Sequence, residues 1–318
     1  MLNWLYRLFL CTVRPVLHRM GLDLVWYRRD SQDEVWARVL QYRDIAESFV
    51  PHERFEAGEK TIWQFWWQGE ANAPEMVRHC MASVKRFVPA GWRVVVIDES
   101  NIERYVAIPD CIRRKHHSGI ITHTHFSDYL RISLLARHGG VWIDATVLLS
   151  GPVPAEALNA RFFMFKSSWW AHAAQIPSVG LLPRLAQTAG LLGVGGGESA
   201  GSSWFLTSAG GSVILNGMIQ LLEHYWTSED SLCDYFIFHK FLSLLISVND
   251  ACRREYVACP TFVNVNPHLL LFALKKTYDA ELWEQIKART TIHKISHKAS
   301  QPYAEGTFGD MATKGTLP

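Results

Sequence analysis

The chain has 318 residues, of which 48% are hydrophobic and 19% are charged, a balance that suits a folded globular protein and excludes a disordered one. Its formal net charge is only +2, so no nucleic-acid partner is expected. The six cysteines form no CxxC pair, which favours buried reduced thiols in a cytosolic protein over a structural zinc site.

Residues 1–58 are predicted to form an N-terminal helical segment. Within residues 1–21, Arg7, Arg14 and His18 share one helical face and apolar side chains occupy the opposite face. A basic amphipathic helix of this kind can lie on an anionic membrane surface, or it can dock on the folded part of its own chain. The pattern leaves both arrangements open. No stretch reaches the ~20 apolar residues that a membrane-spanning helix needs.

From residue 59 onward, apolar strands alternate with helices. Residues 60–69 and 92–98 read as strands, each followed by a helical pattern. This alternation is typical of an α/β fold with a mostly parallel sheet flanked by helices. Ligands of such sheets bind at the carboxyl ends of the strands. Trp66, Asp98 and Asp144 all lie at predicted strand ends, so we expect them near a binding site.

The second half of the chain is predicted to be largely helical. Residues 191–206 contain a glycine cluster without the GK[ST] of a P-loop, and we predict a mobile loop there. Residues 210–226 and 231–248 carry helical patterns. The polar stretch at residues 301–318 contains three glycines and is predicted to be a flexible tail.

Two histidines precede the helical pattern of residues 126–140. His123 and His125 suggest the two-histidine loop of metal-dependent hydrolases, but Asp128 stands one place too late for the HxHxDH pattern. A solvated loop before the helix is therefore favoured. A metal-dependent hydrolase that uses both histidines is kept as an alternative.

Three charged side chains around a Gly-Gly turn form the main candidate site. Asp128 and Arg131 are spaced i, i+3 and so share one helical face. After Gly139 and Gly140, the chain enters a buried strand that ends at Asp144. A carboxylate in the resulting crevice can ligate a divalent cation, which in turn can hold a diphosphate. The alternative for Asp128 and Arg131 is a surface ion pair worth under ~1 kcal/mol.

The stretch FSDYLRISLLARHGGVWIDATVLL, residues 126–149, resembles the core of bacterial capsular polysaccharide synthesis proteins. These proteins are grouped with mannosyltransferases and glucosylating toxins that share an SD-x-x-R…GG-h-h-x-D-x-D segment on a GT-A-type fold. The stretches TIWQFWWQG, DYFIFHKF and IHKISHK agree with that family. The resemblance covers roughly residues 59–298 and implies a GT-A-like (Rossmann-like) catalytic domain at residues 59–300.

The resemblance implies roles for the charged residues of the central motif. Asp128 and Arg131 match the pair that holds the donor sugar and its phosphate, and Asp144 matches the first acid of the DxD metal motif. The motif reads Asp-Ala-Thr here, so Thr146 stands in place of the second acid. A hydroxyl can ligate Mn²⁺ or Mg²⁺ but brings no charge. The cation can therefore be held mostly by Asp144 and the donor, or be replaced in part by basic side chains.

The resemblance extends to other donor contacts. Trp66 matches a strand-end tryptophan that stacks on the nucleotide base, and Asp98 is expected beside it. His293 and Lys294 match a late His-Lys pair that can reach the diphosphate. From the residues alone, Trp66 can equally be a core aromatic, and residues 292–298 can be a solvated basic stretch.

The function that the resemblance implies is glycosyl transfer. A hexosyltransferase-type enzyme would move a sugar from a nucleotide-diphospho-sugar to an oligosaccharide or lipid-linked saccharide acceptor, with retention, in capsular or surface polysaccharide biosynthesis. Asp234 and His239 are candidates for acceptor contacts, with a buried helix pair as the alternative. The expected location is cytoplasmic, peripheral on the inner face of a bacterial plasma membrane. Two alternatives to a glycosyltransferase are kept. One is a non-catalytic scaffold that binds sugar nucleotides, and the other is the metal-dependent hydrolase that uses His123 and His125.

Overall fold

The computed structural model describes residues 29–51, 60–166, 200–296 and 302–318. The predicted N-terminal amphipathic helix and the glycine cluster of the predicted loop lie outside the described residues. Among the described helices, none combines the length and the apolar character needed to cross a membrane.

A five-stranded sheet forms the centre of the molecule, with strand order β2-β1-β3-β6-β5. Its strands are β1 (Thr61–Phe65), β2 (Arg93–Ile97), β3 (Gly140–Ile143), β5 (Phe162–Lys166) and β6 (Gly201–Ser208). Strand β1 is parallel to β2 and β3, whereas β6 is antiparallel to both β3 and β5. All strands of this sheet except β6 therefore point the same way, which confirms the predicted mostly parallel α/β fold.

A second, two-stranded sheet joins distant parts of the chain. Strand β4 (Val147–Leu149) pairs with the antiparallel strand β7 (Ile292–Lys294), and Val147 lies opposite Lys294. Because β4 follows β3 after a short turn, this pairing places His293 and Lys294 of β7 near the carboxyl end of β3.

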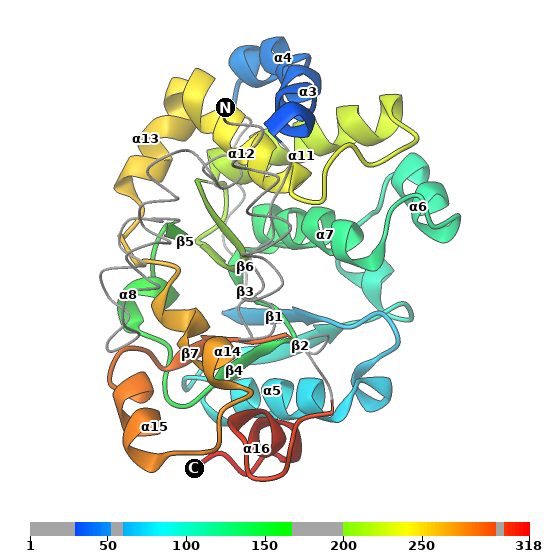
Figure 1. Cartoon of the computed structure of the whole chain (residues 1–318). Coiled ribbons are helices and arrows are strands. Elements are labelled where there is room, and N and C mark those ends of the chain that lie inside the picture. The colour runs from blue at the N-terminus through cyan, green and yellow to red at the C-terminus, as the bar shows by residue number, and fades with distance from the viewer. Residues whose placement is uncertain (1–28, 52–59, 167–199, 297–301) are drawn as a thin grey trace, which may run out of the picture.

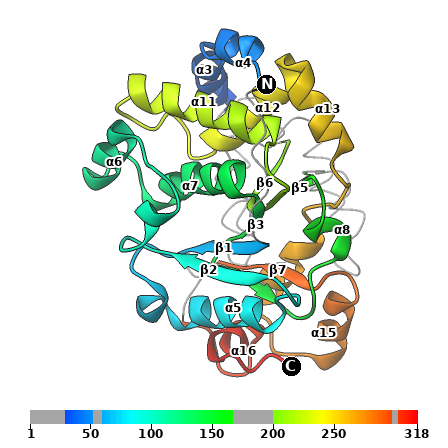
Figure 2. The same cartoon turned by 180° about the vertical axis from the view of Figure 1, so that it is seen from behind.

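Helices cover both faces of the central sheet (Figures 1 and 2). One side carries α7 (His123–His138), with α11 (Val213–Ser228) and α12 (Ile237–Val248) beyond it, and the other carries α5 (Glu75–Arg86) and α16 (Phe308–Lys314). The other described helices are α3 (Arg29–Leu40), α4 (Arg43–Ser48), α6 (Asp110–His117), α8 (Ala155–Leu158), α13 (Asp250–Ala258), α14 (Leu269–Ala273) and α15 (Ala280–Lys287), with 3₁₀ turns at Glu70–Asn72, Ile102–Arg104 and Asn266–His268.

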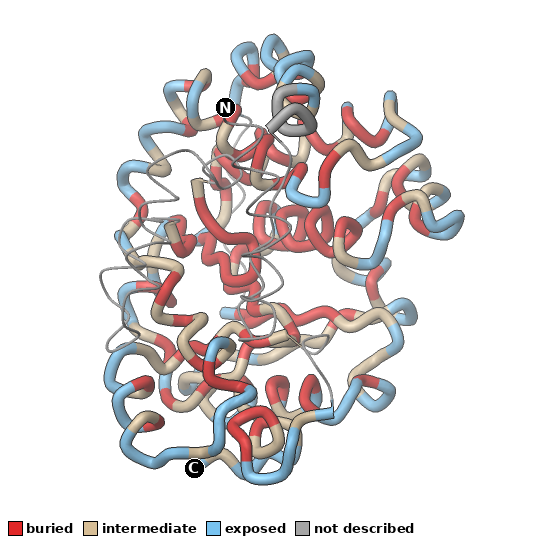
Figure 3. The backbone as a smooth tube through the Cα atoms, viewed as in Figure 1, coloured by how far each residue is buried: buried red, intermediate tan, exposed pale blue. Residues whose placement is uncertain are grey.

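The helix α7 is buried along most of its length (Figure 3). The backbone N–H of His125 donates to the Thr122 side chain, which caps the helix. The helix therefore begins at His123, and the expectation that the two histidines stand in a loop before it is wrong. Gly140 ends the turn into β3 at φ 95°, where an added Cβ would collide with the Thr61 carbonyl.

Two segments are more ordered than the sequence predicted. Residues 202–206, assigned to the glycine-rich loop, belong to the buried strand β6. The predicted flexible tail instead contains α16, where Phe308 and Ala312 join an apolar cluster with Met76 of α5 and Trp283 of α15. The tail prediction is therefore wrong, because a few well-placed apolar side chains anchor a mostly polar segment.

The described part of the N-terminal segment packs on the same core as the rest of the chain. Helices α3 and α4 contact α12, and Val39, Ala46 and Phe49 belong to the main apolar cluster. Asn249 caps α13 and also donates from Nδ2 to the carbonyls of Ala46 and Phe49, at 3.2 and 3.0 Å. These contacts tie residues 29–51 to the junction of α12 and α13.

Candidate active site

The predicted strand-end residues lie at one edge of the sheet. Trp66, Asp98 and Asp144 follow β1, β2 and β3, which are adjacent and parallel, so their carboxyl ends meet. Trp66 packs beside an apolar cluster that includes Ala145. Asp98 accepts hydrogen bonds at Oδ1 from the N–H and hydroxyl of Ser100, at 2.9 and 2.6 Å, and so fixes its own turn.

Asp128 and Arg131 form a buried ion pair. Arg131 Nη1 lies 2.7 Å from Asp128 Oδ1, and the two side chains are only 4% and 10% exposed. Arg131 also donates from Nη2 to Ser127 Oγ at 2.7 Å, and its guanidinium carbon lies 5.1 Å from the centre of the Trp142 ring. The same Nη2 lies 3.4 Å from Asp144 Oδ1. The alternative of a surface ion pair is therefore excluded. Through Arg131, the ion pair on α7 is linked to Asp144 at the end of β3.

Asp144 is surrounded by donors on both oxygens. Trp142 Nε1 donates to Oδ1 at 2.8 Å, and the Lys294 ammonium donates to Oδ2 at 2.8 Å. Lys294 also donates to the Thr146 hydroxyl at 2.6 Å. The side chains of Lys294 and Asp144 are 19% and 21% exposed, so the cluster is reached by solvent while most of its surface is covered.

The two carboxylates differ in their ionisation. Burial disfavours the charge on Asp144, but Lys294 and Arg131 outweigh it and lower its pKa. At Asp128 burial prevails over the attraction of Arg131 and His125, so the pKa of that carboxyl is raised. The site thus combines a firmly ionised carboxylate with one that protonates more readily, a separation common where carboxylates take different roles.

Of the two predicted acceptor contacts, His239 is the one on which the Arg131 charge acts. Burial and then the Arg131 charge lower the pKa of His239 to about 4, so its ring is neutral near pH 7. Its Nδ1 is buried without a hydrogen-bond partner among the described residues. Asp234 instead accepts a hydrogen bond from the Phe236 N–H at 2.6 Å, and its charge attracts the Lys240 ammonium. It therefore stabilises the turn into α12.

His293 and Lys294 face opposite ways, because neighbouring residues on a strand alternate. His293 is 0% exposed, with Nε2 2.8 Å from Ser150 Oγ and its ring 5.2 Å from that of Trp283. Burial lowers its pKa to about 3. The prediction that His293 reaches a donor phosphate is therefore wrong, whereas Lys294 does enter the cluster.

The hydrolase alternative finds no ligand set. His123 Nδ1 lies 2.9 Å from His116 Nε2, while His125 binds the Thr122 hydroxyl and the Tyr235 carbonyl. The two rings therefore serve different neighbours. Among residues 29–51, 60–166, 200–296 and 302–318, no three His, Cys, Asp or Glu side chains are grouped to hold a metal.

The predicted Mn²⁺ or Mg²⁺ ligands do not form a cation site as they stand. Asp144 Oδ2 and Thr146 Oγ1, the oxygens such an ion would bind, both accept from the Lys294 ammonium. Asp144 Oδ1 faces Trp142 and Arg131. Hard divalent ions need several oxygen ligands. Here the side-chain oxygens of Asp144 and Thr146 already accept hydrogen bonds or face a positive charge.

No site role was predicted for Ser127, the serine of the SD-x-x-R motif, or for Trp142. Both could have been found from spacing: Ser127 precedes Arg131 by one helical turn, and Trp142 precedes Asp144 by one strand repeat, so each pair shares a face. Ser203 of β6, which hydrogen-bonds Asp128, has no such local signal.

The site can be compared with known proteins. The family described as capsular polysaccharide synthesis protein matches residues 28–309. An O-glycosyltransferase of Phomopsis amygdali, PaGT, is 29% identical over 114 residues, which are 33% of this chain and 28% of that protein. The O-glycosyltransferase braB of Annulohypoxylon truncatum is 30% identical over 141 residues, or 42% of this chain and 30% of that one.

A third relative, the glycosyltransferase afumC of Aspergillus fumigatus, is 28% identical over 114 residues, or 33% of this chain and 29% of that protein. The chain thus matches about three tenths of the length of these relatives. All three are fungal, so they do not confirm the bacterial origin that the sequence motif suggested.

Proposed function

The chain belongs to the capsular polysaccharide synthesis protein family, and from that premise we propose that it is a glycosyltransferase that moves a sugar from a nucleotide-diphospho-sugar to a saccharide acceptor. One observation carries the proposal: Arg131 and Lys294 converge on Asp144 at the carboxyl ends of parallel strands. Relatives named as glycosyltransferases support the reaction class.

The convergence suits the main difficulty of glycosyl transfer, which is charge. The anomeric carbon becomes oxocarbenium-like while negative charge grows on the departing diphosphate. Fixed positive groups stabilise that charge most where water is largely excluded. Arg131, held by Asp128 and Ser127 in a buried position, and Lys294 at the solvent-reached side of Asp144 are placed to do this.

The other residues are proposed to position the two substrates. Trp66 would hold the nucleotide base at the end of β1, and Asp128 would orient the donor sugar through a hydroxyl. His239, a neutral ring whose pKa is lowered by burial and by the Arg131 charge, would contact the acceptor. We include retention of configuration in the proposal, because both carboxylates of the cluster are tied to Arg131 and neither is placed as a separate base.

The acceptor is proposed to be an oligosaccharide or lipid-linked saccharide in surface polysaccharide synthesis, which the family description supports. Transfer to an oxygen is favoured by the names of the two O-glycosyltransferases. The proposed location is the cytoplasmic face of a membrane, with residues 1–21 as the contact.

Donor binding is the experiment that tests this function. Calorimetry of the full chain with UDP- and GDP-sugars should show saturable binding of at least one donor, and assays of released nucleoside diphosphate should show turnover once a saccharide acceptor is added. Arg131→Lys should weaken binding, since an ammonium lacks the planar fork through which Nη1 and Nη2 reach Asp128 and Ser127. Absence of binding to every nucleotide sugar would overturn the proposal, and binding without transfer to any acceptor would favour the scaffold.

A further inference from the structure

The DxD position of this chain contains an ammonium group between its two oxygen-bearing side chains. Lys294 Nζ lies 2.8 Å from Asp144 Oδ2 and 2.6 Å from Thr146 Oγ1. A bound Mg²⁺ would lie at about 2.0–2.1 Å from such oxygens, so the ammonium and the ion would compete for one place. We propose that Lys294 takes the role of the divalent cation, so that this chain holds the donor diphosphate and transfers its sugar without a metal. The inference rests on the proposed function.

The position of Lys294 is fixed by its backbone. Lys294 pairs with Val147 in the β4–β7 ladder, and the Ile295 N–H donates to the Thr146 carbonyl at 3.0 Å. Its two neighbours, His293 and Ile295, are almost completely buried. A side chain anchored in this way loses little freedom when it meets a ligand, unlike a lysine on a mobile surface loop.

The charges of the cluster also favour an ammonium over an ion. When all four groups are ionised, Asp128 and Asp144 balance Arg131 and Lys294. A divalent cation added beside them would have no further carboxylate to balance it, because Thr146 replaces the second acid. A diphosphate, in contrast, brings negative charge to two cations that are already in place.

Lys294 retains the means to bind a phosphate. An ammonium has three N–H donors. Two of them go to Asp144 and Thr146, so among the described contacts one remains for a phosphate oxygen. Because the side chain is 19% exposed, that donor can be reached from solvent.

The transfer step requires no change in the protonation of Arg131 or Lys294. The bond between the anomeric carbon and the diphosphate oxygen breaks, and its electron pair goes to the diphosphate. The acceptor oxygen then bonds to the anomeric carbon on the same face, and its proton passes to the departing diphosphate oxygen. Lys294 and Arg131 stay protonated throughout and stabilise the growing negative charge by hydrogen bonds.

The test compares donor binding and turnover of the full chain in Mn²⁺ and in EDTA. Wild type should bind the same UDP- or GDP-sugar within about twofold in both conditions. Lys294→Met should lower turnover by roughly 100-fold or more, the effect of removing one charge-stabilising donor. Lys287→Met is the matched control, because Lys287 is also a partly buried lysine, 2.8 Å from Glu284, on the neighbouring helix α15.

A second variant restores a metal motif and keeps the test independent of folding defects in the first. Thr146→Asp combined with Lys294→Ala presents two acids and no ammonium, so its donor binding should return with Mn²⁺ and disappear in EDTA. Wild-type binding that requires Mn²⁺ and is unaffected by Lys294→Met would overturn the inference while leaving the transferase intact. Absence of donor binding in every condition would instead overturn the proposed function.

Discussion

Lys294 and Lys115 both place an ammonium among oxygen atoms, but the oxygens differ in kind. Lys294 donates to the side chains of Asp144 and Thr146 at the carboxyl ends of strands. Lys115 of α6 donates to main-chain carbonyls at the end of α11. The first pair of oxygens plays no part in backbone structure, so a ligand can share the ammonium. The second pair would be left unsatisfied if the ammonium moved.

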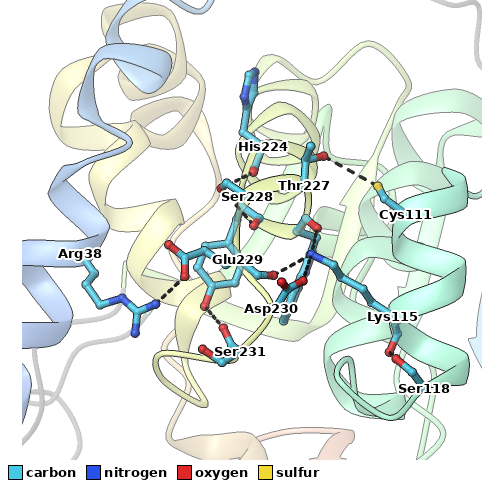
Figure 4. A network of polar contacts seen from close by, with 12 residues as sticks. Arg38, Cys111, Lys115, Ser118, His224, Thr227, Ser228, Glu229, Asp230 and Ser231 are labelled. Carbon is cyan, nitrogen blue, oxygen red and sulfur yellow. Dashed lines mark hydrogen bonds and ion pairs between the residues drawn. The ribbon is translucent and has the colours of Figure 1, made fainter.

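Figure 4 shows the Lys115 ammonium among oxygen atoms at the end of α11. Its Nζ lies 2.6 Å from the Trp226 carbonyl, 2.8 Å from the Glu229 carbonyl and 2.9 Å from Asp230 Oδ1. The Glu229 carboxylate in turn pairs with Arg38 of α3. This network joins α3, α6 and α11, and its positive charge suits the negative end of the α11 dipole. The comparison predicts that charge at the strand ends governs ligand binding and charge at the helix end governs stability.

The largest effect is expected from Arg131→Met, which removes the group common to Asp128 and Asp144. Loss of one partner of a buried ion pair should lower the free energy of unfolding by about 3–5 kcal/mol and abolish donor binding. Urea unfolding followed by tryptophan fluorescence would measure the first effect. The control is Arg43→Met, since Arg43 makes an exposed i, i+4 pair with Glu47. Equal destabilisation by the two variants would contradict the prediction.

The two lysines provide the direct test of the comparison. Lys115→Met should lower the free energy of unfolding by about 1–3 kcal/mol, because two carbonyls lose a charged donor. Its donor affinity should match wild type. Lys294→Met should show the reverse: weak donor binding and a smaller loss of stability, since Asp144 keeps Trp142 and Arg131. Similar donor affinities for both variants would show that the distinction between the two regions is mistaken.

Two buried histidines extend the comparison to pH. Folding lowers the pKa of His239 to about 4 and that of His293 to about 3, from an ordinary value near 6.5. The neutral ring is favoured in the folded state, so each contribution to stability is complete above about pH 6.5 and is lost as the pH falls through the folded-state pKa, about 4 for His239 and about 3 for His293. Urea titrations across this range should show that loss, and His239→Gln should reduce it.

Ligand binding should separate the same two histidines. The Arg131 charge helps to lower the pKa of His239, whereas Lys287 acts on His293. A nucleoside diphosphate bound at Arg131 should therefore raise the pKa of His239 and leave that of His293 unchanged, as measured by NMR titration of the imidazole protons. Parallel shifts of both rings would argue against binding at the strand ends.

The smallest effect is expected at Lys85, an exposed lysine 2.6 Å from Glu70. Lys85→Met should change the free energy of unfolding by no more than about 1 kcal/mol, because solvent screens an exposed pair. Donor binding should be unaffected. A loss comparable with that of Lys115→Met would show that distance to a carboxylate, rather than the kind of oxygen, decides what a lysine contributes.

The sequence by itself determined the elements whose signals are local. Apolar runs that end in Trp66, Asp98 and Asp144 predicted parallel strands and the edge at which they meet, and the structure confirms that arrangement. The i, i+3 spacing of Asp128 and Arg131 predicted a shared face. Such signals repeat within one turn or one strand, so the chain encodes them without reference to distant residues.

Only the tertiary structure decided which distant residues join that edge. Lys294 enters the cluster and His293 faces the core because β7 pairs with β4 in one register, and a shift by one residue would exchange them. The order of α16 likewise depends on Phe308 reaching an apolar cluster shared with Met76. Register and burial arise from contacts between segments far apart in the chain, and the local pattern of IHKISHK does not contain them.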